Sequence, residues 1–275
     1  MPPAPEPWPP IAGANFDDAD VVRCYAHRPP YPPALYDRLL ALSPGRGRAI
    51  DLGCGPGKIA GVLAAAFDEV VAVDPSRPML AAARATHAAT NILWILGVAE
   101  TARLQGPADL VTAGASIHWM DHAAVFPRLA DVLAPGAVVA VIDGDGAFEP
   151  PWREAWFDTM TDWVARFGER YDPKLFDKKG QAYQAWLDVG GEEHFAFEHR
   201  QSVESLIACE HSRSTWTRAR MGKARAAAFD DDLRRILAPH AADGRLSYQV
   251  RTRLVWGRPR ASPATSAGQI GPGGV

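Results

Sequence analysis

The stretch DLGCGPGK, residues 51–58, decides the fold. It ends a short apolar run, Arg48–Leu52, that predicts a buried strand, and it leads into the alanine-rich run Lys58–Phe67, which predicts a helix. Glycines in such a turn let the backbone come close to a ligand, and free amides at the start of a helix favour a carboxylate or a phosphate. The sequence therefore predicts a ligand-binding turn between a strand and a helix.

Two carboxylates narrow the choice of ligand. Asp74 ends the next apolar run, Glu69–Asp74, where a carboxylate can accept hydrogen bonds from both hydroxyls of a ribose. The glycines follow the pattern Gly-x-Gly-x-Gly, which departs from the G-x-G-x-x-G of dinucleotide-binding turns. Asp51, just before them, would repel a pyrophosphate but suits an ammonium group. The pattern indicates an adenosine-containing ligand with an amino-acid end, such as S-adenosylmethionine.

Short β-branched runs alternate with alanine-rich runs along most of the chain, which is typical of an α/β fold around a parallel sheet. A segment rich in aromatic residues interrupts this pattern, and we interpret about residues 147–190 as a cap insertion over the carboxyl edge of the sheet. Further strands are expected at Asn91–Leu96, Asp109–Ala113, Ala137–Asp143, Phe195–Arg200 and Leu246–Trp256, and further helices at Ala34–Leu42, Pro78–His87, Asp121–Leu133, Val203–Met221 and Asp230–His240.

The composition excludes several classes of protein. No apolar run approaches the roughly 20 residues needed to cross a bilayer, and a formal net charge of -3 gives no general attraction to nucleic acid. Three widely spaced cysteines favour neither a disulfide framework nor a zinc site. We expect a flexible leader over residues 1–20, one domain over 21–260 and a disordered tail over 261–275, in a cytoplasmic monomer or homodimer with no membrane or nucleic-acid partner.

Five motifs occur in the order and spacing of class I S-adenosylmethionine-dependent methyltransferases, which the chain resembles from about Tyr25 to Trp256. They are DLGCGPGK (51–58), VVAVDPSRPML (70–80), GVAE (97–100), DLVTAGASIHWMD (109–121) and LAPGAVVAVID (133–143). The segments YAHRPPYP (25–32) and SIHW (116–119) resemble the small-molecule branch that includes trans-aconitate methyltransferase and the ubiquinone and menaquinone biosynthesis methyltransferases. The resemblance implies a Rossmann-like α/β fold with a seven-stranded, mostly parallel sheet flanked by helices, its last strand antiparallel. It also implies methyl transfer from S-adenosylmethionine to a small organic acceptor.

Carried over position by position, the resemblance implies which residues bind the cofactor. It places Asp74 on the ribose hydroxyls and Asp51, Gly53 and Gly55 around the methionyl portion, and the guanidinium of Arg28 suits the cofactor carboxylate. The positions expected near the adenine are Pro75, Met79, Val98, Ala99 and Glu100, and those near the sulfonium are Ala113, Ala115 and Ser116. The residue types also allow plainer roles, with Asp74 as a helix cap, Met79 as core and Glu100 as a surface acid.

His118 is the candidate general base, because a group that removes a proton from the acceptor would sit at the carboxyl edge of the sheet beside the fourth strand. Its alternative role is a local hydrogen bond that orients the loop. An aromatic wall would suit a flat apolar acceptor and the cationic sulfonium. The candidates for the acceptor site are Tyr25, Tyr31, Trp119, Trp152, Trp156 and His211, the last with a solvated position beside capping serines as its alternative.

Two other functions remain open: an NAD(P)-dependent oxidoreductase on a similar sheet, and a noncatalytic protein that keeps the cofactor fold. The glycine spacing, Asp51 and the GVAE segment weigh against the oxidoreductase. Asp143 and Asp145 could offer oxygen ligands to magnesium. Gly144 and Gly146 indicate a flexible turn instead, so no metal is expected.

Overall fold

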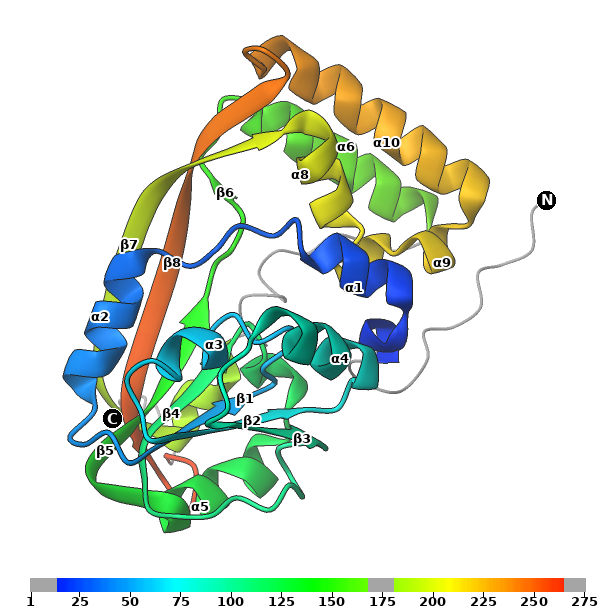
Figure 1. Ribbon diagram of the computed structural model, residues 1–275. Helices are drawn as coiled ribbons and strands as arrows, with labels where there is room; N and C mark the ends of the chain where they lie inside the picture. Colours follow the sequence, from blue (N-terminus) through cyan, green and yellow to red (C-terminus); the bar gives the residue numbers. More distant parts are fainter. Residues whose placement is uncertain (1–13, 168–180, 265–275) are drawn as a thin grey trace, which may run out of the picture.

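The computed structural model describes residues 14–167 and 181–264, and within them a mixed sheet forms the centre of the molecule (Figure 1). The strand order is β3-β2-β1-β4-β5-β8-β6, with β7 paired to β8. Five strands run parallel to their neighbours: β1 (Arg48–Leu52), β2 (Glu69–Asp74), β3 (Ile92–Leu96), β4 (Ala108–Gly114) and β5 (Leu133–Asp143). β8 (Arg245–Pro259) runs antiparallel to β5, to the two-residue strand β6 (Ala147–Phe148) and to β7 (Leu187–Ser202). The predicted mostly parallel sheet with an antiparallel last strand is confirmed, and β6 is added to the seven strands expected.

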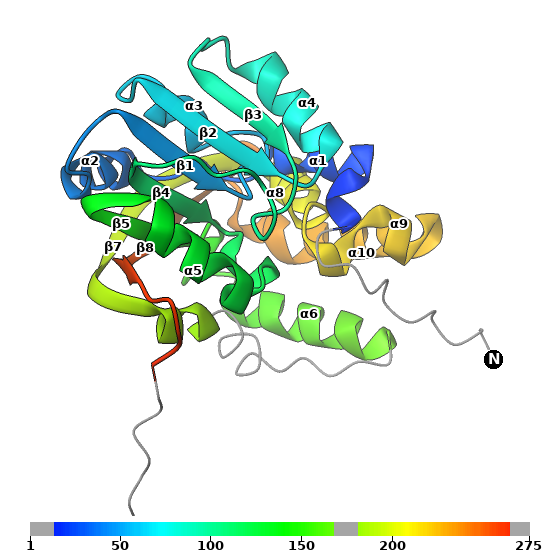
Figure 2. The ribbon, with the colours of Figure 1, turned by 90° about the horizontal axis from the view of Figure 1, so that it is seen from below.

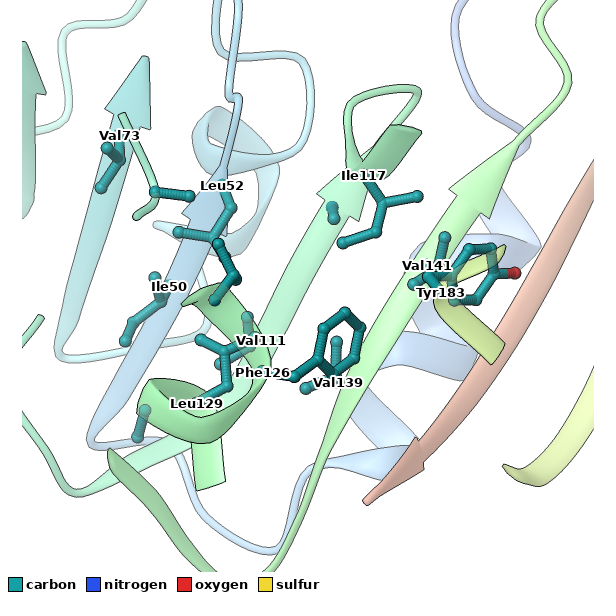
Figure 3. Close-up of a cluster of buried hydrophobic side chains, with 14 of the residues drawn as sticks. Ile50, Leu52, Val73, Val111, Ile117, Phe126, Leu129, Val139, Val141 and Tyr183 are labelled. Atoms are coloured by element: carbon teal, nitrogen blue, oxygen red, sulfur yellow. The ribbon is translucent and has the colours of Figure 1, made fainter. Parts of the chain in front are cut away.

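Helices cover both faces of this sheet. Successive residues of a strand point to opposite faces, and apolar residues on each face pack against helices. Ile50 and Leu52 pack in one cluster with Phe126 and Leu129 of α5 (His122–Val132), as Figure 3 shows. Ala49, which directly precedes Ile50, packs in a second cluster on the opposite face. That cluster includes residues of α2 (Pro33–Leu42), α3 (Ala60–Leu63) and α4 (Arg77–Thr86), which Figure 2 shows on the side away from α5.

The helix predicted over Lys58–Phe67 is regular only in α3. Gly57 has a φ of +83°, so the turn continues past the glycines before the helix begins. Helical hydrogen bonding extends to Phe67, whose amide donates to the carbonyl of Leu63 at 3.0 Å. The helical hydrogen bonding therefore ends at Phe67, as predicted, but the helix begins at Ala60 and not at Lys58, because the turn occupies the residues before it.

β7 and β8 form a ribbon that extends past the sheet. They pair from Leu187 and Pro259 at one end to Ser202 and Arg245 at the other. β5 pairs with β8 only up to Asp143 and Arg253. The part of the ribbon beyond Arg253 therefore projects from the carboxyl edge of the parallel strands, and Figure 1 shows a layer of helices at its far end.

These helices, which we call the lid, are α6 (Arg153–Arg166), α8 (Val203–Glu210), α9 (Arg218–Met221) and α10 (Lys223–Leu237). Trp163 of α6 and Phe229 of α10 meet edge to face at 5.5 Å, within a separate hydrophobic cluster that also contains residues of the ribbon. The lid is thus built from two segments of the chain, whereas the sequence prediction placed a cap only in about residues 147–190. Part of that expected cap, residues 168–180, lies outside the described residues.

The helix predicted over Val203–Met221 is broken into α8, the 3-10 turn η4 (Ser214–Trp216) and α9. The hydroxyl of Ser212 donates to the carbonyl of Cys209 at 2.6 Å, and Thr217 caps α9 by accepting from the amide of Arg220. Serine and threonine side chains compete in this way with helical backbone bonds. The helix predicted over Asp230–His240 begins earlier, at Lys223, and is followed by the turn η5 (Ala238–His240).

The amino-terminal segment differs from its prediction. Residues 14–20 were expected in a flexible leader, but they form the turn η1 (Ala14–Asp17) and the start of α1 (Ala19–Tyr25). Asp18 caps α1 through the amide of Asp20 at 2.7 Å. In the expected tail, the amide of Ala264 donates to the carbonyl of Ala185, in the turn η3 (Ala182–Trp186), at 2.7 Å. The rest of the leader, residues 1–13, and the rest of the tail, residues 265–275, lie outside the described residues.

We predict that the lid core contributes strongly to stability. Leu233 on α10 is fully buried, so Leu233→Ala should lower the free energy of unfolding by about 2–5 kcal/mol through lost burial and a cavity. The matched control is Leu93→Ala, because Leu93 is 51% exposed on β3 and its loss should cost less than about 1 kcal/mol. Chemical denaturation measures both, and equal losses would contradict the assignment of Leu233 to a packed core.

Candidate active site

The glycine turn is fixed at the carboxyl ends of β1 and β2. The amides of Gly53 and Cys54 both donate to the carbonyl of Val73, at 2.8 and 3.0 Å. Gly53 has a φ of +64°, and a Cβ there would lie 2.4 Å from the Cβ of Ser116. Only glycine fits this position, because both the backbone conformation and the close approach exclude a side chain.

Asp74 is tied to the same turn. Its carboxylate accepts from the amide of Gly55 at 2.7 Å and from the amide of Ser76 at 2.8 Å. Burial raises the pKa of Asp74, while these two hydrogen bonds oppose the shift. Each carboxylate oxygen uses one chain donor, and an ionised carboxyl can accept about four hydrogen bonds. The group is therefore held in one orientation with acceptor capacity left for a ligand hydroxyl.

Asp51 is also buried, but its oxygens face the chain. One accepts from the hydroxyl of Thr112 on β4 at 2.8 Å, and the other accepts from the amide of Ala60 at the start of α3 at 3.1 Å. Burial raises the pKa of Asp51 to about 7. The sequence predicted that this carboxylate faces a ligand ammonium, whereas here it positions the turn by joining β1, β4 and α3.

The end of β4 lies directly against this turn. The hydroxyl of Ser116 donates to the carbonyl of Leu52 at 2.6 Å. Ala115 has a φ of +51°, and its amide donates to the carbonyl of Ile142 at the end of β5. Ala113 is fully buried in the core. The structure thus brings the predicted residues of β4 and of the turn together.

The residues predicted around an adenine have mixed environments. Val98 is 43% exposed, while Ala99 and Met79 are buried. Glu100 accepts from the amide of Asp121 at 2.8 Å, just before α5. Pro75 is exposed directly after Asp74. Glu100 is accordingly fixed by the chain, and Val98 and Pro75 offer exposed apolar surface.

Phe16 covers this region, which the sequence did not predict. Its ring meets Tyr25 and Trp119 edge to face, at 6.3 and 6.2 Å. Its carbonyl accepts from the hydroxyl of Ser76 at 2.6 Å. The available signal was an aromatic residue just before the capping sequence of α1, but the proline-rich run ahead of it indicated a leader.

Arg28 differs most from its predicted role as a partner of the cofactor carboxylate. Its guanidinium forms an ion pair with Asp145 at 3.1 Å and donates to the hydroxyl and the carbonyl of Ser212, at 2.7 and 3.0 Å. The same group stacks over Tyr25, 4.2 Å from the ring centre. The nearby Arg28 and Arg213 hold the pKa of Asp145 far below its usual range despite burial. Arg28 therefore joins the amino-terminal segment to the lid.

His118 lies in the turn η2 (Ile117–Trp119), beside the end of β4, and its side chain is exposed. Its ring packs against Trp119 at 4.9 Å. Loss of hydration lowers the pKa of His118, and Arg28 and His122 lower it further. At neutral pH the imidazole is therefore uncharged, which is the form that accepts a proton.

The predicted acceptor residues fall into two groups. Tyr25, Tyr31 and Trp119 lie around the turn, since the hydroxyl of Tyr25 is 3.9 Å from the Cβ position of Gly55 and that of Tyr31 is 3.1 Å from that of Gly114. Trp119 contacts Phe16 and His118, as described above. Trp152 and Trp156 line a cavity of about 260 Å³ beneath the lid.

His211 does not belong to either group. It is fully buried, and its ring nitrogens are paired with the carbonyl of Trp216 and the carboxylate of Asp230, both at 2.6 Å. Both ring nitrogens are used by the chain, so the prediction that His211 binds the acceptor is wrong. Its role is to hold the lid together.

The described residues contain neither a group of metal ligands nor a membrane-spanning helix. Within residues 14–167 and 181–264, no three His, Cys, Asp or Glu side chains are grouped so that they could hold a metal ion. None of the helices in the same ranges has the length and apolar character that crossing a bilayer requires. Asp145, weighed as a magnesium ligand from the sequence, instead pairs with Arg28 and Arg213.

Comparison with known proteins assigns this geometry to a family. Residues 49–136 match the family described as methyltransferase domain, and these residues include the glycine turn, Asp74 and His118. This part of the chain thus resembles a class I S-adenosylmethionine-dependent methyltransferase domain. S-adenosylmethionine is the cofactor of this class, and the match favours it over the NAD(P)-dependent interpretation.

The methyltransferase domain resembles curated trans-aconitate 2-methyltransferases. The protein of Methylobacterium radiotolerans is 33% identical over 186 residues, which cover 62% of this chain and 66% of that protein. The protein of Variovorax paradoxus is 38% identical over 113 residues, which cover 40% and 43%. The matched region thus spans just under two thirds of the first relative and less than half of the second.

A solved structure shares the fold of the methyltransferase. It comes from Anaeromyxobacter dehalogenans, where it is named as a candidate type II methyltransferase. The TM-score is 0.66 at 23% identity, over 86% of this chain and 99% of that one. The predicted Rossmann-like methyltransferase fold is confirmed.

We predict that Asp51 makes the stability of the protein depend on pH. Its folded-state pKa of about 7 lies above the unfolded value of about 3.9, so between these pH values the folded protein holds a proton that the unfolded chain has released. The free energy of unfolding should fall as pH rises through this window, by at most about 1.4 kcal/mol per pH unit from this group.

Denaturant titrations from pH 4.5 to 7.5 measure this contribution as the difference between the wild type and Asp51→Asn. The variant should show the shallower decline. The control is Asp68→Asn, because Asp68 is exposed before β2 and should leave the slope unchanged. Parallel curves for the wild type and Asp51→Asn would contradict the prediction.

Proposed function

We propose that this protein transfers a methyl group from S-adenosylmethionine to a small organic acceptor by in-line displacement. The observation that carries the proposal is the Asp74 carboxylate, held by the amides of Gly55 and Ser76 beside a turn that only glycines can form. Neither Asp74 nor Asp51 forms an ion pair with a cationic side chain of residues 14–167 and 181–264. A ligand that brings hydroxyls to this edge fits the free acceptor capacity of Asp74.

The residues around the turn supply distinct parts of the proposed cofactor site. Gly53 and Gly55 would line the methionyl portion, with Asp51 beneath them as a support for the turn. Asp74 would bind the ribose hydroxyls. The adenine would lie near Pro75, Met79, Val98, Ala99 and Glu100, and the sulfonium near Ala113, Ala115 and Ser116.

The chemistry asks little of the protein beyond alignment. A bound S-adenosylmethionine supplies a methyl group on a positively charged sulfur, so attack by an acceptor lone pair forms one bond to the methyl carbon while the carbon–sulfur bond breaks and sulfur keeps the electron pair. The chain contributes by holding the acceptor close and in line. His118 would take the proton that an acidic acceptor loses, because its imidazole is neutral at pH 7 and lies beside the end of β4.

Two observations bear on which class of molecule accepts the methyl group: the names of the relatives and the residues of the lid. The relatives named above act on trans-aconitate according to their names, which makes a small acid one candidate for this chain. The family match ends at residue 136, before the lid begins, whereas the match to the Methylobacterium radiotolerans protein covers 62% of the chain and extends into the lid. The residues of the lid itself therefore provide the second observation.

A single experiment distinguishes this enzyme from a noncatalytic protein with the same fold. The full chain is incubated with methyl-labelled S-adenosylmethionine and a small-molecule extract. Transfer of label to a product that passes a size filter supports the proposal. Tight binding of S-adenosylhomocysteine with no labelled product from any extract would favour the noncatalytic protein.

We expect Asp74→Asn to weaken binding of S-adenosylhomocysteine by about 1–3 kcal/mol, or roughly 5- to 150-fold in Kd, because the charge-assisted hydrogen bonds to the ribose are lost. The asparagine oxygen can still accept from the amide of Gly55, whereas its NH2 group cannot accept from the amide of Ser76. Calorimetry measures the affinity, with Asp68→Asn as an exposed carboxylate control. An unchanged Kd in Asp74→Asn would remove this residue from the site.

We expect His118→Ala to lower the rate of methyl transfer about 10²-fold or more if the acceptor must lose a proton. The affinity for S-adenosylhomocysteine should stay within twofold of the wild type, because the side chain is exposed and does not support the glycine turn. Transfer of label to the acceptor identified above provides the rate. A variant that raises only the acceptor KM would show that His118 orients the acceptor and is not its base.

A further inference from the structure

We infer that the cavity beneath the lid is the acceptor site and that it selects an uncharged, largely apolar acceptor with one hydrogen-bonding group over a polycarboxylate. This inference rests on the proposed methyl transfer. It concerns residues that lie outside the matched domain, since the cavity is formed mainly by the segment after β5 and by α6 and α8 of the lid.

The cavity is close to the glycine turn. The hydroxyl of Tyr25 lies 3.9 Å from the Cβ position of Gly55, and Arg28 stacks on the same ring. Arg28 in turn pairs with Asp145, which lines the cavity, as does Pro29. One layer of side chains, Tyr25 and Arg28, therefore connects the turn to the cavity at the carboxyl edge of the sheet.

The shape and lining of the cavity suit a flat apolar molecule. Its volume is about 260 Å³, and its apolar wall includes Pro29, Pro150, Trp152, Trp156, Leu206 and Tyr248. Ligand sites in proteins are lined mostly by apolar and aromatic side chains with a few polar groups that fix orientation. Two tryptophans facing one small volume provide such a lining.

The charges of the lining disfavour an anionic acceptor. The lining holds three carboxylates, Asp145, Glu149 and Glu210, and two guanidiniums, Arg153 and Arg213. The guanidinium of Arg28, behind the lining, also pairs with Asp145. Both guanidiniums of the lining already have partners. Arg213 pairs with Glu210 at 3.0 Å and with Asp145 at 3.3 Å, and Arg153 lies 3.6 Å from Glu149. An acceptor carboxylate would have to displace a partner of Arg213, whose two carboxylates are at most 12% exposed, and a charge buried without a partner is costly. The exposed pair of Arg153 and Glu149 contributes little to this selection.

One polar group of the lining needs a partner. The hydroxyl of Tyr248 is buried and has no hydrogen-bond partner within the described ranges. Burial raises the pKa of Tyr248, so the hydroxyl stays protonated and can donate. A buried donor left unpaired costs about 1–3 kcal/mol. A neutral oxygen or nitrogen on the acceptor would recover part of this cost once a small shift of the Tyr248 side chain brings its hydroxyl, which has almost no accessible surface, to the cavity.

Binding of two matched probes to the full chain tests the charge selection. The probes are 2-naphthol and 2-naphthoate, which share a bicyclic ring but differ in charge at pH 7, and calorimetry is run with saturating S-adenosylhomocysteine. We expect 2-naphthol to bind roughly tenfold or more tightly than 2-naphthoate. Tyr248→Phe should weaken 2-naphthol several-fold. Equal or tighter binding of 2-naphthoate, or tighter binding of a tricarboxylate, would overturn the inference.

A matched pair of variants tests the location. Gly146 lines the cavity, has no positive φ, and a Cβ there meets only Arg213 at 3.6 Å, so Gly146→Val fills the space with little strain. Ala227→Leu adds the same three carbons on the exposed face of α10. Gly146→Val should weaken 2-naphthol roughly tenfold or more, and Ala227→Leu should not. Loss in both variants or in neither would show that the probe binds elsewhere.

Two readouts separate this inference from the proposed function. S-adenosylhomocysteine should bind the wild type and Gly146→Val equally, which also shows that the variant folds, whereas failure to bind the wild type would refute the methyltransferase proposal alone. In the extract assay, label should pass into an organic phase at pH 7, and its rate of transfer should fall in Gly146→Val. Labelled product retained entirely on an anion-exchange resin would overturn the acceptor class while supporting methyl transfer.

Discussion

The hydrogen bond from the amide of Gly55 to the carboxylate of Asp74 is the constraint on which the site depends. It can form only because β1 and β2 are parallel neighbours whose carboxyl ends meet at one edge of the sheet. The amides of Gly53 and Cys54 bind the carbonyl that immediately precedes Asp74 in the chain. The turn after β1 and the end of β2 therefore form one rigid unit, and this unit determines where a ligand can lie.

The features that depend on residues close together in the chain, such as short strands and the glycine turn, could be predicted from the sequence. β1 and β2 have the predicted bounds because short apolar runs between turns leave few alternatives, and the glycine pattern together with Asp74 indicated the ligand site. The lid could not be predicted in the same way. It depends on the pairing of β7 with β8, which joins residues far apart in the chain, and on Trp163 and Phe229 meeting across two segments. Helical periodicity shows that a helix has an apolar face but not which partner covers it.

The errors at polar positions share one physical cause. Arg28 and His211 were each considered as ligand contacts because of their chemistry, and each is already bound by other residues of the chain. A buried polar group is costly unless it is paired, so an internal partner is present before any ligand arrives. Sequence shows the type of group but not whether a serine such as Ser212, distant in the chain, already binds it. Asp74 differs because, within the described residues, two backbone amides are its only donors, one for each carboxylate oxygen, and this leaves acceptor capacity free.

The charge network around Asp145 joins the amino-terminal segment to the lid and also forms part of the cavity wall. Arg28 and Arg213 hold this carboxylate from two sides, one in the amino-terminal segment and one after α8. Their pairing keeps both parts of the chain at the carboxyl edge without leaving an unpaired charge in the cavity wall. Attack of a neutral acceptor on a sulfonium spreads an existing positive charge and creates no new one, so such a reaction needs little help from solvent. An apolar pocket beside the cofactor turn is therefore compatible with the proposed transfer, whereas an acceptor with several carboxylates would lose its hydration at a cost that this network offsets only in part, because its guanidiniums already pair with carboxylates.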